Sequence, residues 1–191
     1  MRILILFLVL SSQLLAQQPG DADYVFTSLQ QADERPKVVY HLNLRKSNLK
    51  NFPKKLERFE NLRTLDLSKN RISMLPSGVG ELTSLEHLVL AGNKIVIIPP
   101  QIARLKNLVV LDLSKNDIKK IPEEIGELEV LKKLDLRLNH VQTIDNNISK
   151  LHQLTELNLQ GMFFSEEVKQ MVAGWLPNIE VQFSGGCDCG F

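Results

Sequence analysis

The sequence predicts an α/β solenoid, in which each turn of the chain is one copy of a repeat and parallel strands line a curved, concave face. One motif, Leu62-x-x-Leu65-x-Leu67-x-x-Asn70, returns along the chain with the same letters. Its copies begin 23 residues apart, at Leu62, Leu85, Leu108, Leu131 and, in degenerate form, Leu154. A proline follows three of the copies, as Pro76, Pro99 and Pro122. These observations predict the fold class before any single element is considered.

Residues 1–16 are predicted to be a secretory signal peptide. Arg2 precedes an apolar run over residues 3–10, which is too short to span a bilayer, and Ala16 is small enough to precede a cleavage site. The expected location is therefore outside the cytoplasm, in the periplasm, at the cell surface or in the medium. Loss of Arg2 changes 23 basic residues to 22, against 22 acidic ones. A formally neutral chain disfavours nucleic acids and charged membranes as partners.

Residues 17–38 are predicted to cap the amino-terminal end, because a solenoid exposes an apolar cross-section at each end. The spacing of Val25, Leu29 and Ala32 predicts a short amphipathic helix over residues 23–33. Pro36 should end this helix.

Residues 39–161 are predicted to form six leucine-rich repeats, each with one strand and one return segment. The alternation Leu65-Asp66-Leu67 places the leucines inside and Asp66 outside. A proline cannot donate to a ladder of backbone hydrogen bonds, so Pro76 should begin a return on the opposite side, in irregular or short helical form. The first repeat starts at Val39 and has a serine in place of the asparagine.

An asparagine ends the motif, where the chain leaves the strand and backbone groups would otherwise be buried without partners. A side-chain amide donates and accepts hydrogen bonds, so a stack of amides can satisfy the turns on either side. A structural role is therefore expected for Asn70, Asn93, Asn116 and Asn139.

Residues 162–184 are predicted to cap the other end with a helix and a strand. Ser165 is followed by two glutamates, which favour a helix start, and Val168, Val172 and Trp175 fall on one face. The alternation of Ile179, Val181 and Phe183 predicts a closing strand. Residues 185–191 are expected to be a flexible tail. Cys187 and Cys189 in this tail leave open a local disulfide, an intermolecular disulfide or two free thiols.

The quoted segments also carry a family resemblance. The sequence IPEEIGEL at residues 121–128 and the ending FSEEVKQMVAGWLPNIEVQF resemble the small secreted leucine-rich-repeat proteins of spirochaetal bacteria. The resemblance covers nearly the whole chain after residue 16, and it implies a bacterial interaction protein that contacts host surface or matrix molecules. The chain departs from the pattern at Asp145, which replaces a proline, at Met162, and at the two cysteines.

Ligand specificity should lie in the outward positions of the strands, because the inward leucines only hold the fold. The outward columns are expected to include Ser68, Ser114 and Asn158. Two copies of the motif read LDLSKN, and the Asp and Lys residues of this filler sequence, such as Asp66 and Lys69, are expected only to solvate the surface and pair across strands.

Counted from the repeat at Val39, the third and fifth repeats depart from this filler and read LVLAGN (residues 88–93) and LDLRLN (residues 134–139). An apolar centre bordered by arginine and histidine has the composition of a protein-binding patch. The ligand-binding residues predicted for the concave face are His87, Val89, Ala91, Val110, Asp112, Lys133, Asp135, Arg137 and Leu138. The alternative is that Val89 and Val110 merely pack together as residues of adjacent strands.

A secondary patch is predicted from Val96 and Ile97, which are apolar where the other repeats have mostly polar residues, together with Met74 one turn away. Such aliphatic side chains can mark an interface, although single exposed ones are ordinary on protein surfaces. The ordinary explanation is favoured at this point.

No catalytic constellation is present in the sequence. The four histidines lie in different repeats, and only His41 and His87 share a column, two strands apart and too far to share a metal. No phosphate-binding loop or nucleophile motif is found. We therefore expect no enzyme, no cofactor and no metal. The sequence favours a secreted module that binds a protein or glycan ligand, such as a host molecule, and the alternative is a structural scaffold of the periplasm or envelope.

Overall fold

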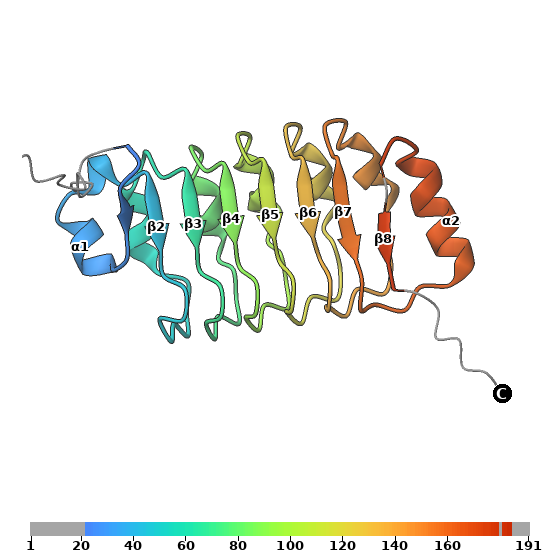
Figure 1. Ribbon diagram of the computed structural model, residues 1–191, viewed down its shortest axis with the longest axis horizontal. Helices are drawn as coiled ribbons and strands as arrows, with labels where there is room; N and C mark the ends of the chain where they lie inside the picture. The colour runs from blue at the N-terminus through green and yellow to red at the C-terminus, as the bar shows by residue number, and fades with distance from the viewer. Residues whose placement is uncertain (1–21, 180, 185–191) are drawn as a thin grey trace, which may run out of the picture.

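The computed structural model describes residues 22–179 and 181–184. Within this part of the chain, eight strands form one sheet in sequence order, and every neighbouring pair is parallel. Figure 1 shows the strands side by side along the long axis of the molecule. The strands are β1 (Val25–Phe26), β2 (His41–Asn43), β3 (Thr64–Asp66), β4 (His87–Val89), β5 (Val110–Asp112), β6 (Lys133–Asp135), β7 (Glu156–Leu159) and β8 (Val181–Phe183).

The register of the strands confirms the predicted solenoid. Leu65 on β3 pairs with Leu88 on β4, which pairs with Leu111 on β5, so equivalent residues are 23 positions apart. Asp66 and Val89 are paired in the same way on the opposite face of the sheet. In a parallel sheet of this order, the chain must return after every strand to the end of the sheet at which the strands begin.

Short 3-10 helices form the return segments and lie behind the sheet in the view of Figure 1. Pro76, Pro99 and Pro122 each occupy the position before the helix, in extended backbone conformation. The predicted helical return after each proline is therefore confirmed. The helices are η1 (Pro36–Val38), η2 (Lys54–Arg58), η3 (Ser77–Glu81), η4 (Pro100–Arg104), η5 (Glu123–Glu127) and η6 (Asn146–Lys150).

A single apolar core runs between the sheet and the 3-10 helices. Leu111, the middle residue of β5, has no exposed surface, and Ile125 on η5 is 2% exposed. Full burial of such a side chain contributes about 1.5–3 kcal/mol to the free energy of unfolding. The same positions are filled in repeat after repeat, so the core is continuous along the solenoid.

The amino-terminal cap differs from the prediction in one respect. The expected helix over residues 23–33 is shorter, because α1 covers only Leu29–Asp33, with Ser28 as its amino-terminal cap. Val25 and Phe26 form β1 instead, and they pair with His41 and Leu42 of β2. The backbone of β2 would otherwise be an unpaired edge, so its hydrogen-bonding groups recruit the preceding segment as a strand.

The carboxy-terminal cap agrees with the prediction. The helix α2 covers Glu166–Trp175, and the Ser165 hydroxyl accepts a hydrogen bond from the backbone N–H of Val168. Val172 is fully buried against the last repeat. The strand β8 then pairs with β7 and closes the sheet. The predicted signal peptide and both cysteines lie outside the described residues.

None of the helices in the described part of the chain has the length and apolar character needed to cross a membrane.

Candidate functional site

The outward face of the sheet, here called the sheet face, presents two rows of side chains. The first row contains the first residue of each strand from β2 to β7: His41, Thr64, His87, Val110, Lys133 and Glu156. The second row contains the third residue of the same strands: Asn43, Asp66, Val89, Asp112, Asp135 and Asn158. The structure thus brings most of the predicted ligand-binding residues onto one surface.

The acids of the second row are partly exposed, and each also accepts a hydrogen bond from the backbone. The carboxylates of Asp66, Asp112 and Asp135 each accept a hydrogen bond from the backbone N–H two residues later, at 2.7, 2.9 and 3.0 Å. Such bonds fix the end of the strand, as Asx turns do. Val89 occupies the same row and cannot accept this bond. The apolar residue is therefore placed where the other repeats have a side-chain carboxylate or amide oxygen that accepts this bond.

The next column along the chain was predicted to face outward, and this was wrong for two of its serines. Ser68 and Ser114 are only 2% and 1% exposed. Their backbone carbonyls accept hydrogen bonds from the neighbouring repeat, so the chain has already turned from the sheet face at this position. Asn158 of the second row is also buried, at 5% exposure, beside the closing strand β8. Ala91 is half-buried and Arg137 is exposed.

Ion pairs hold the two basic residues of the predicted site. Lys133 pairs with Glu156 at 2.9 Å, and Arg137 pairs with Asp135 at 3.3 Å. Burial raises the pKa of the Asp135 carboxyl above its ordinary value, and the charges of Asp112 and Glu156 act in the same direction. The backbone N–H and the guanidinium of Arg137 oppose this rise.

The centre of the predicted site is an apolar spot between these charges. Val89 is paired with Asp112, and Val110 is paired with His87. The two valines are therefore diagonal neighbours on adjacent strands rather than direct partners, and both remain partly accessible on the sheet face. A ligand that covered the spot would bury both side chains, and covering His87 and Lys133 as well would extend the contact along the first row.

Leu138 lies away from this spot, at the edge where the strands end. Its backbone is left-handed, with φ of 55°, and its side chain is 49% exposed. It lines a hollow of about 500 Å³ with His140, Gly161 and Phe163. The structure thus separates Leu138 from the other predicted residues of the sheet face.

The secondary patch is accessible. Met74 and Ile97 are 68% and 69% exposed, and Val96 is 39% exposed. Val96 and Ile97 line a hollow of about 660 Å³ whose other walls include Lys119, Lys120, Glu123, Glu124 and Asp145. The sequence identified these aliphatic residues but gave no sign of the hollow, which forms only when successive turns are stacked.

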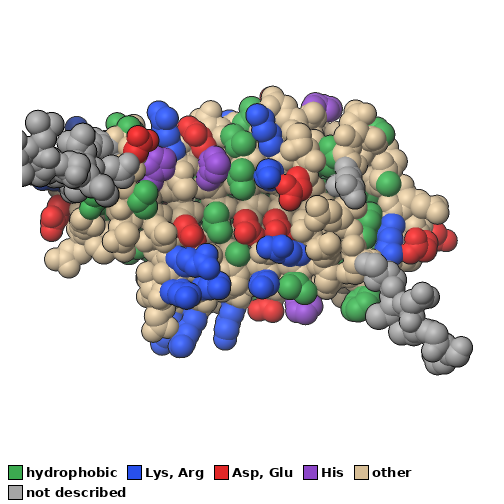
Figure 2. Space-filling view, in the orientation of Figure 1, with side chains coloured by type: hydrophobic (Ala, Val, Ile, Leu, Met, Phe, Trp, Pro, Cys, Tyr) green, Lys and Arg blue, Asp and Glu red, His purple; other side chains and the backbone are tan. Residues whose placement is uncertain are grey.

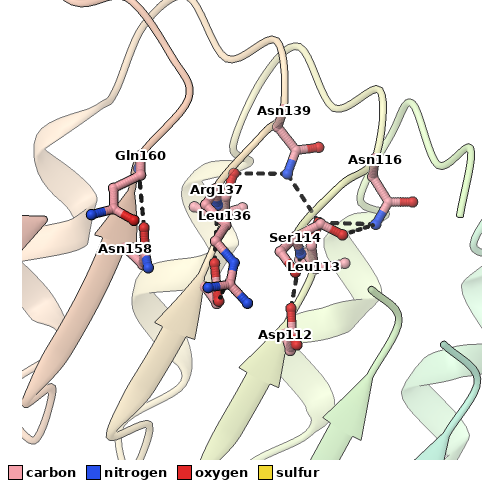
Figure 3. Close-up of polar contacts among 10 residues, drawn as sticks. Asp112, Leu113, Ser114, Asn116, Leu136, Arg137, Asn139, Asn158 and Gln160 are labelled. Carbon is pink, nitrogen blue, oxygen red and sulfur yellow. Dashed lines mark hydrogen bonds and ion pairs between the residues drawn. The ribbon is translucent and has the colours of Figure 1, made fainter. Parts of the chain in front are cut away.

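The four asparagines of the motif are buried and bonded to their own turn and to the preceding one, and Figure 3 shows the Asn139 side chain between the two turns. The Asn139 side chain donates to the carbonyl oxygens of Leu113 and Leu136 at 2.9 and 2.8 Å, and its oxygen accepts from the backbone N–H of Ile118 at 3.1 Å. Asn70, Asn93 and Asn116 make the equivalent bonds one repeat earlier each. This pattern is the one that a structural role requires.

No cluster of three or more potential metal ligands occurs among the described residues. His41 and His87 lie in the same row with Thr64 between them, as the sequence spacing implied. The sheet face of the described chain carries charged side chains and a small apolar spot, and such groups can contact a ligand.

The stacked turns, the asparagine ladder and the sheet face define a repeat solenoid of the leucine-rich type. The chain belongs to the leucine-rich repeat family, whose pattern matches residues 37–95, 83–137 and 106–161. Proteins of this family commonly mediate protein interactions, and the fold is generally a non-enzymatic scaffold.

Solved structures of bacterial and plant proteins share this fold. The Leptospira interrogans LRR protein LIC12759 is 30% identical, with a TM-score of 0.66 over 82% of this chain and 46% of that chain. Internalin C2 from Listeria monocytogenes is 23% identical, with a TM-score of 0.71 over 83% of this chain and 66% of its own, and this likeness concerns the fold alone.

A plant structure extends the comparison. The LRR ectodomain of the Arabidopsis thaliana membrane receptor kinase GASSHO1/SCHENGEN3, in complex with CASPARIAN STRIP INTEGRITY FACTOR 2, is 25% identical, with a TM-score of 0.56 over 83% of this chain and 22% of that one. The present chain thus spans less than two thirds of each of these relatives. No curated protein matches it.

Proposed function

We propose that this chain is an exported, non-enzymatic bacterial interaction module that binds a protein ligand on the sheet face of its third to fifth repeats. The likeness to the Leptospira LRR protein supports a bacterial origin. The observation that carries the binding proposal is the accessible apolar spot at Val89 and Val110, set among charged residues on a rigid sheet. Apolar residues with a charged border are typical of protein interfaces.

The contact would combine the apolar spot with polar recognition at its border. Arg137 is exposed and already bonded to a carboxylate of its own chain, so its guanidinium can donate hydrogen bonds to a ligand carboxylate in place of Asp135. His87 and Lys133 extend the contact along the first row. A ligand with apolar and acidic groups fits this surface, and host surface or matrix proteins are the proposed source.

A double variant and a matched control test this proposal. Val89→Asp with Arg137→Glu should reduce binding at least about tenfold, because the apolar contact and the guanidinium are both lost. The control, Asn43→Asp with Arg45→Glu, changes the same columns of the first repeat and alters the net charge equally. All four side chains are at least partly accessible, so both variants should fold.

The measurement is biosensor binding of purified extracellular-matrix proteins and of envelope extracts to the immobilised chain. Binding of a matrix protein that is lost only in the Val89 and Arg137 variant supports the proposal. Equal binding by both variants contradicts the assignment to the third to fifth repeats. Binding confined to envelope extracts contradicts a host ligand and favours an envelope scaffold.

Export is proposed on the sequence of residues 1–16, which lie outside the described part of the chain. Expression of the full chain in a bacterial host should yield exported protein that begins at Gln17, because signal peptidase cuts after a small residue such as Ala16. Amino-terminal sequencing of the periplasmic and medium fractions measures this. Intact Met1 in the soluble cytoplasmic fraction would contradict the proposal.

A further inference from the structure

A row of cations follows the strands at the edge where the chain leaves the sheet. This basic edge consists of Arg45, Lys46, Lys69, Arg71, Lys94 and Lys115, from the first four repeats. Figure 2 shows the blue side chains gathered at the lower margin of the sheet face, beneath β2 to β5. Lys46, Lys69 and Lys115 occupy one position of the repeat, and Arg71 and Lys94 occupy the position two residues later. The cations therefore recur in successive turns, and the row runs along the solenoid.

Backbone hydrogen bonds between turns keep the basic edge in register. The N–H of Lys46 donates to the carbonyl of Ser68 at 3.0 Å, and the N–H of Lys69 donates to the carbonyl of Ala91 at 2.7 Å. The N–H of Lys115 donates to the next repeat in the same way. The ladder therefore continues past the strands, and successive turns are about 5 Å apart, as neighbouring strands are.

The backbone turns the lysines of the basic edge outward at a conformational cost. Lys46, Lys69 and Lys115 have left-handed backbone, with φ of 58°, 55° and 56°. The third repeat has Gly92 in this column, which adopts the same conformation with φ of 69° and without a Cβ penalty.

All six cations are exposed. Within the described residues, none of their side chains forms a hydrogen bond or ion pair. The nearest acids in the second row of the sheet face, Asp66 and Asp112, hold backbone N–H groups at 2.7 and 2.9 Å. Some cations elsewhere are paired, as Arg104 is with Glu81 at 2.8 Å, whereas Lys132 and Lys150 form no ion pair within the described residues either. The basic edge differs from those single lysines because its cations follow one another in successive turns. The cations of the edge therefore form no direct ion pair with the described acids and are accessible to an anionic ligand.

The formal net charge of the chain, only +1, gives no sign of this row of cations. Acidic residues at the 3-10 helices and at the amino ends of the strands pair with cations of neighbouring turns, whereas Asp66 and Asp112 end their strands beside the basic edge without forming an ion pair. The basic edge ends at Asp117, which lies 3.6 Å from His140. The first four repeats therefore carry a continuous positive margin, and such a margin attracts linear polyanions.

We propose that the basic edge binds a linear sulfated polysaccharide, which lies along the solenoid with one anionic group near each turn. This surface is distinct from the apolar spot of the proposed protein ligand. A polymer with regularly repeating anionic groups matches a row of regularly repeating cations. Lysines, which dominate the row, act as point charges and need no fixed geometry from the anion.

Other polyanions fit this surface less well. Single-stranded nucleic acids bind through aromatic stacking in addition to charge, and no aromatic residue belongs to the basic edge. An anionic membrane would meet the nearby secondary patch, whose hollow is lined by Lys119 and Lys120 and by the acids Glu123, Glu124 and Asp145. The three acids outnumber the two lysines, so this hollow adds no attraction to an anionic lipid surface. A flexible polymer can follow the edge without reaching them.

Binding of a heparin oligosaccharide of defined length tests the proposal, measured by calorimetry on the chain from Gln17 at several salt concentrations. The edge variant is Lys69→Glu with Lys94→Glu and Lys115→Glu. The control is Lys37→Glu with Lys132→Glu and Lys150→Glu, whose exposed lysines lie outside the basic edge and carry the same change in net charge. A third variant, with glutamine at the three edge positions, removes charge without adding acids.

We expect the wild-type chain to bind heparin, with an affinity that falls steeply between about 50 and 200 mM salt. The edge variant should lose at least about tenfold in affinity, and the slope of log affinity against log salt should fall by about 2–3. The glutamine variant should lose affinity in the same direction, and the control should stay within about twofold of wild type.

Three results would overturn the proposal. The first is absence of heparin binding by the wild-type chain at low salt. The second is an equal loss in the edge variant and the control, which would show a response to net charge alone. The third is tighter binding to single-stranded DNA or to phosphatidylserine vesicles than to heparin, with the same dependence on the edge lysines, which would assign the edge to that other polyanion.

Discussion

At the scale of single residues, each repeat is held by polar side chains that serve the backbone. Asn116 is 4% exposed, donates to the carbonyls of Leu90 and Leu113, and accepts from the N–H of Ile95. Its amide therefore satisfies groups in two turns of the solenoid. Asp112 satisfies one backbone N–H and is partly exposed. The two side chains belong to the same repeat and differ mainly in the number of buried groups that depend on them.

Asn116→Ala should lower the free energy of unfolding by about 1–3 kcal/mol, because buried backbone groups lose their partners. Asp112→Ala should cost less, about 0.5–1.5 kcal/mol, since only one backbone hydrogen bond is lost. Denaturant unfolding of both variants measures this difference. A larger loss for Asp112→Ala would show that the Asx turns, rather than the buried asparagines, hold the turns together.

The raised pKa of Asp135 predicts a pH dependence of stability with a definite sign. The folded state holds the proton of this carboxyl more tightly than the unfolded chain, so ionisation destabilises the folded state above the raised pKa. Asp135→Asn removes that penalty. Its free energy of unfolding should therefore exceed that of the wild type at pH 7, and the difference should shrink as the pH falls towards about 4.

Asp33 provides the control of opposite sign. The hydrogen bond from Lys55, with the charge of Arg58, lowers the pKa of this carboxyl below its ordinary value. Asp33→Asn should therefore lower the free energy of unfolding at neutral pH, and the effect should vanish in acid. Urea unfolding from pH 7 to about pH 3 compares the two variants with the wild type. A gain in stability for Asp33→Asn at pH 7 would contradict this reasoning.

The sequence predicts well which residues are buried. It predicts poorly the backbone conformation of the residue before each asparagine. The leucine positions follow from period-two alternation, and Leu65, Leu88 and Leu111 are all fully buried. The left-handed backbone at Lys69 and Leu138 was not anticipated, because neither residue type indicates it. The signal was nevertheless present, since Gly92 and Gly161 occupy the same column, and glycine is the residue that this conformation favours.

At the scale of elements, the 3-10 helices stack so closely that two glycines mark the contact. A Cβ at Gly126 on η5 would overlap the backbone carbonyl oxygen of Asn147 on η6. A Cβ at Gly78 on η3 would overlap only the carboxylate of Glu57. A backbone atom in the next turn cannot move without displacing that turn, whereas an exposed glutamate side chain can take another rotamer.

Gly126→Ala should therefore lower the free energy of unfolding by about 1–3 kcal/mol, as overpacking does. Gly78→Ala should change it by no more than about 0.5 kcal/mol, as most surface substitutions do. Both replace glycine by alanine in a 3-10 helix, so each controls for the conformational preference of the other. Similar thermal unfolding curves for the two variants would show that the helices are free to separate.

The end elements show where sequence patterns stop being informative. The helix α2 was predicted because its cap, acidic first turn and apolar face agree. The strand β1 was missed because two residues are too short to display a period, and Val25 and Ala32 also fit a helical face. The backbone needs of β2, which lie outside the segment, decide its conformation.

At the scale of the whole molecule, the surfaces depend on stacking and could be predicted only in part. The apolar spot at Val89 follows from comparing the chain with its own repeats, because a departure from the filler is visible in the letters. The basic edge was hidden by the nearly equal totals of acids and bases, 22 and 23, since a total does not show where charges lie. The hollow beside Ile97 depends on neighbouring turns and leaves no sequence pattern.

A solenoid is stable only when both ends of its core are covered, and this gives the last prediction. A chain of residues 17–161 lacks α2 and β8, so it would expose the edge of β7 and the side of the last repeat against which Val172 and Leu176 pack. We expect this truncated chain to aggregate, because an uncapped apolar cross-section and an unpaired strand both favour association.

The matched control is a chain of residues 17–184, which keeps the whole carboxy-terminal cap and should be monomeric with the thermal unfolding curve of the chain ending at Phe191. Size-exclusion chromatography with light scattering, followed by circular dichroism melting, distinguishes the three proteins. A folded, monomeric 17–161 chain would mean that the repeats alone close their core. The cap would then be dispensable for solubility, and the stability of the solenoid would rest on the contacts between neighbouring turns alone.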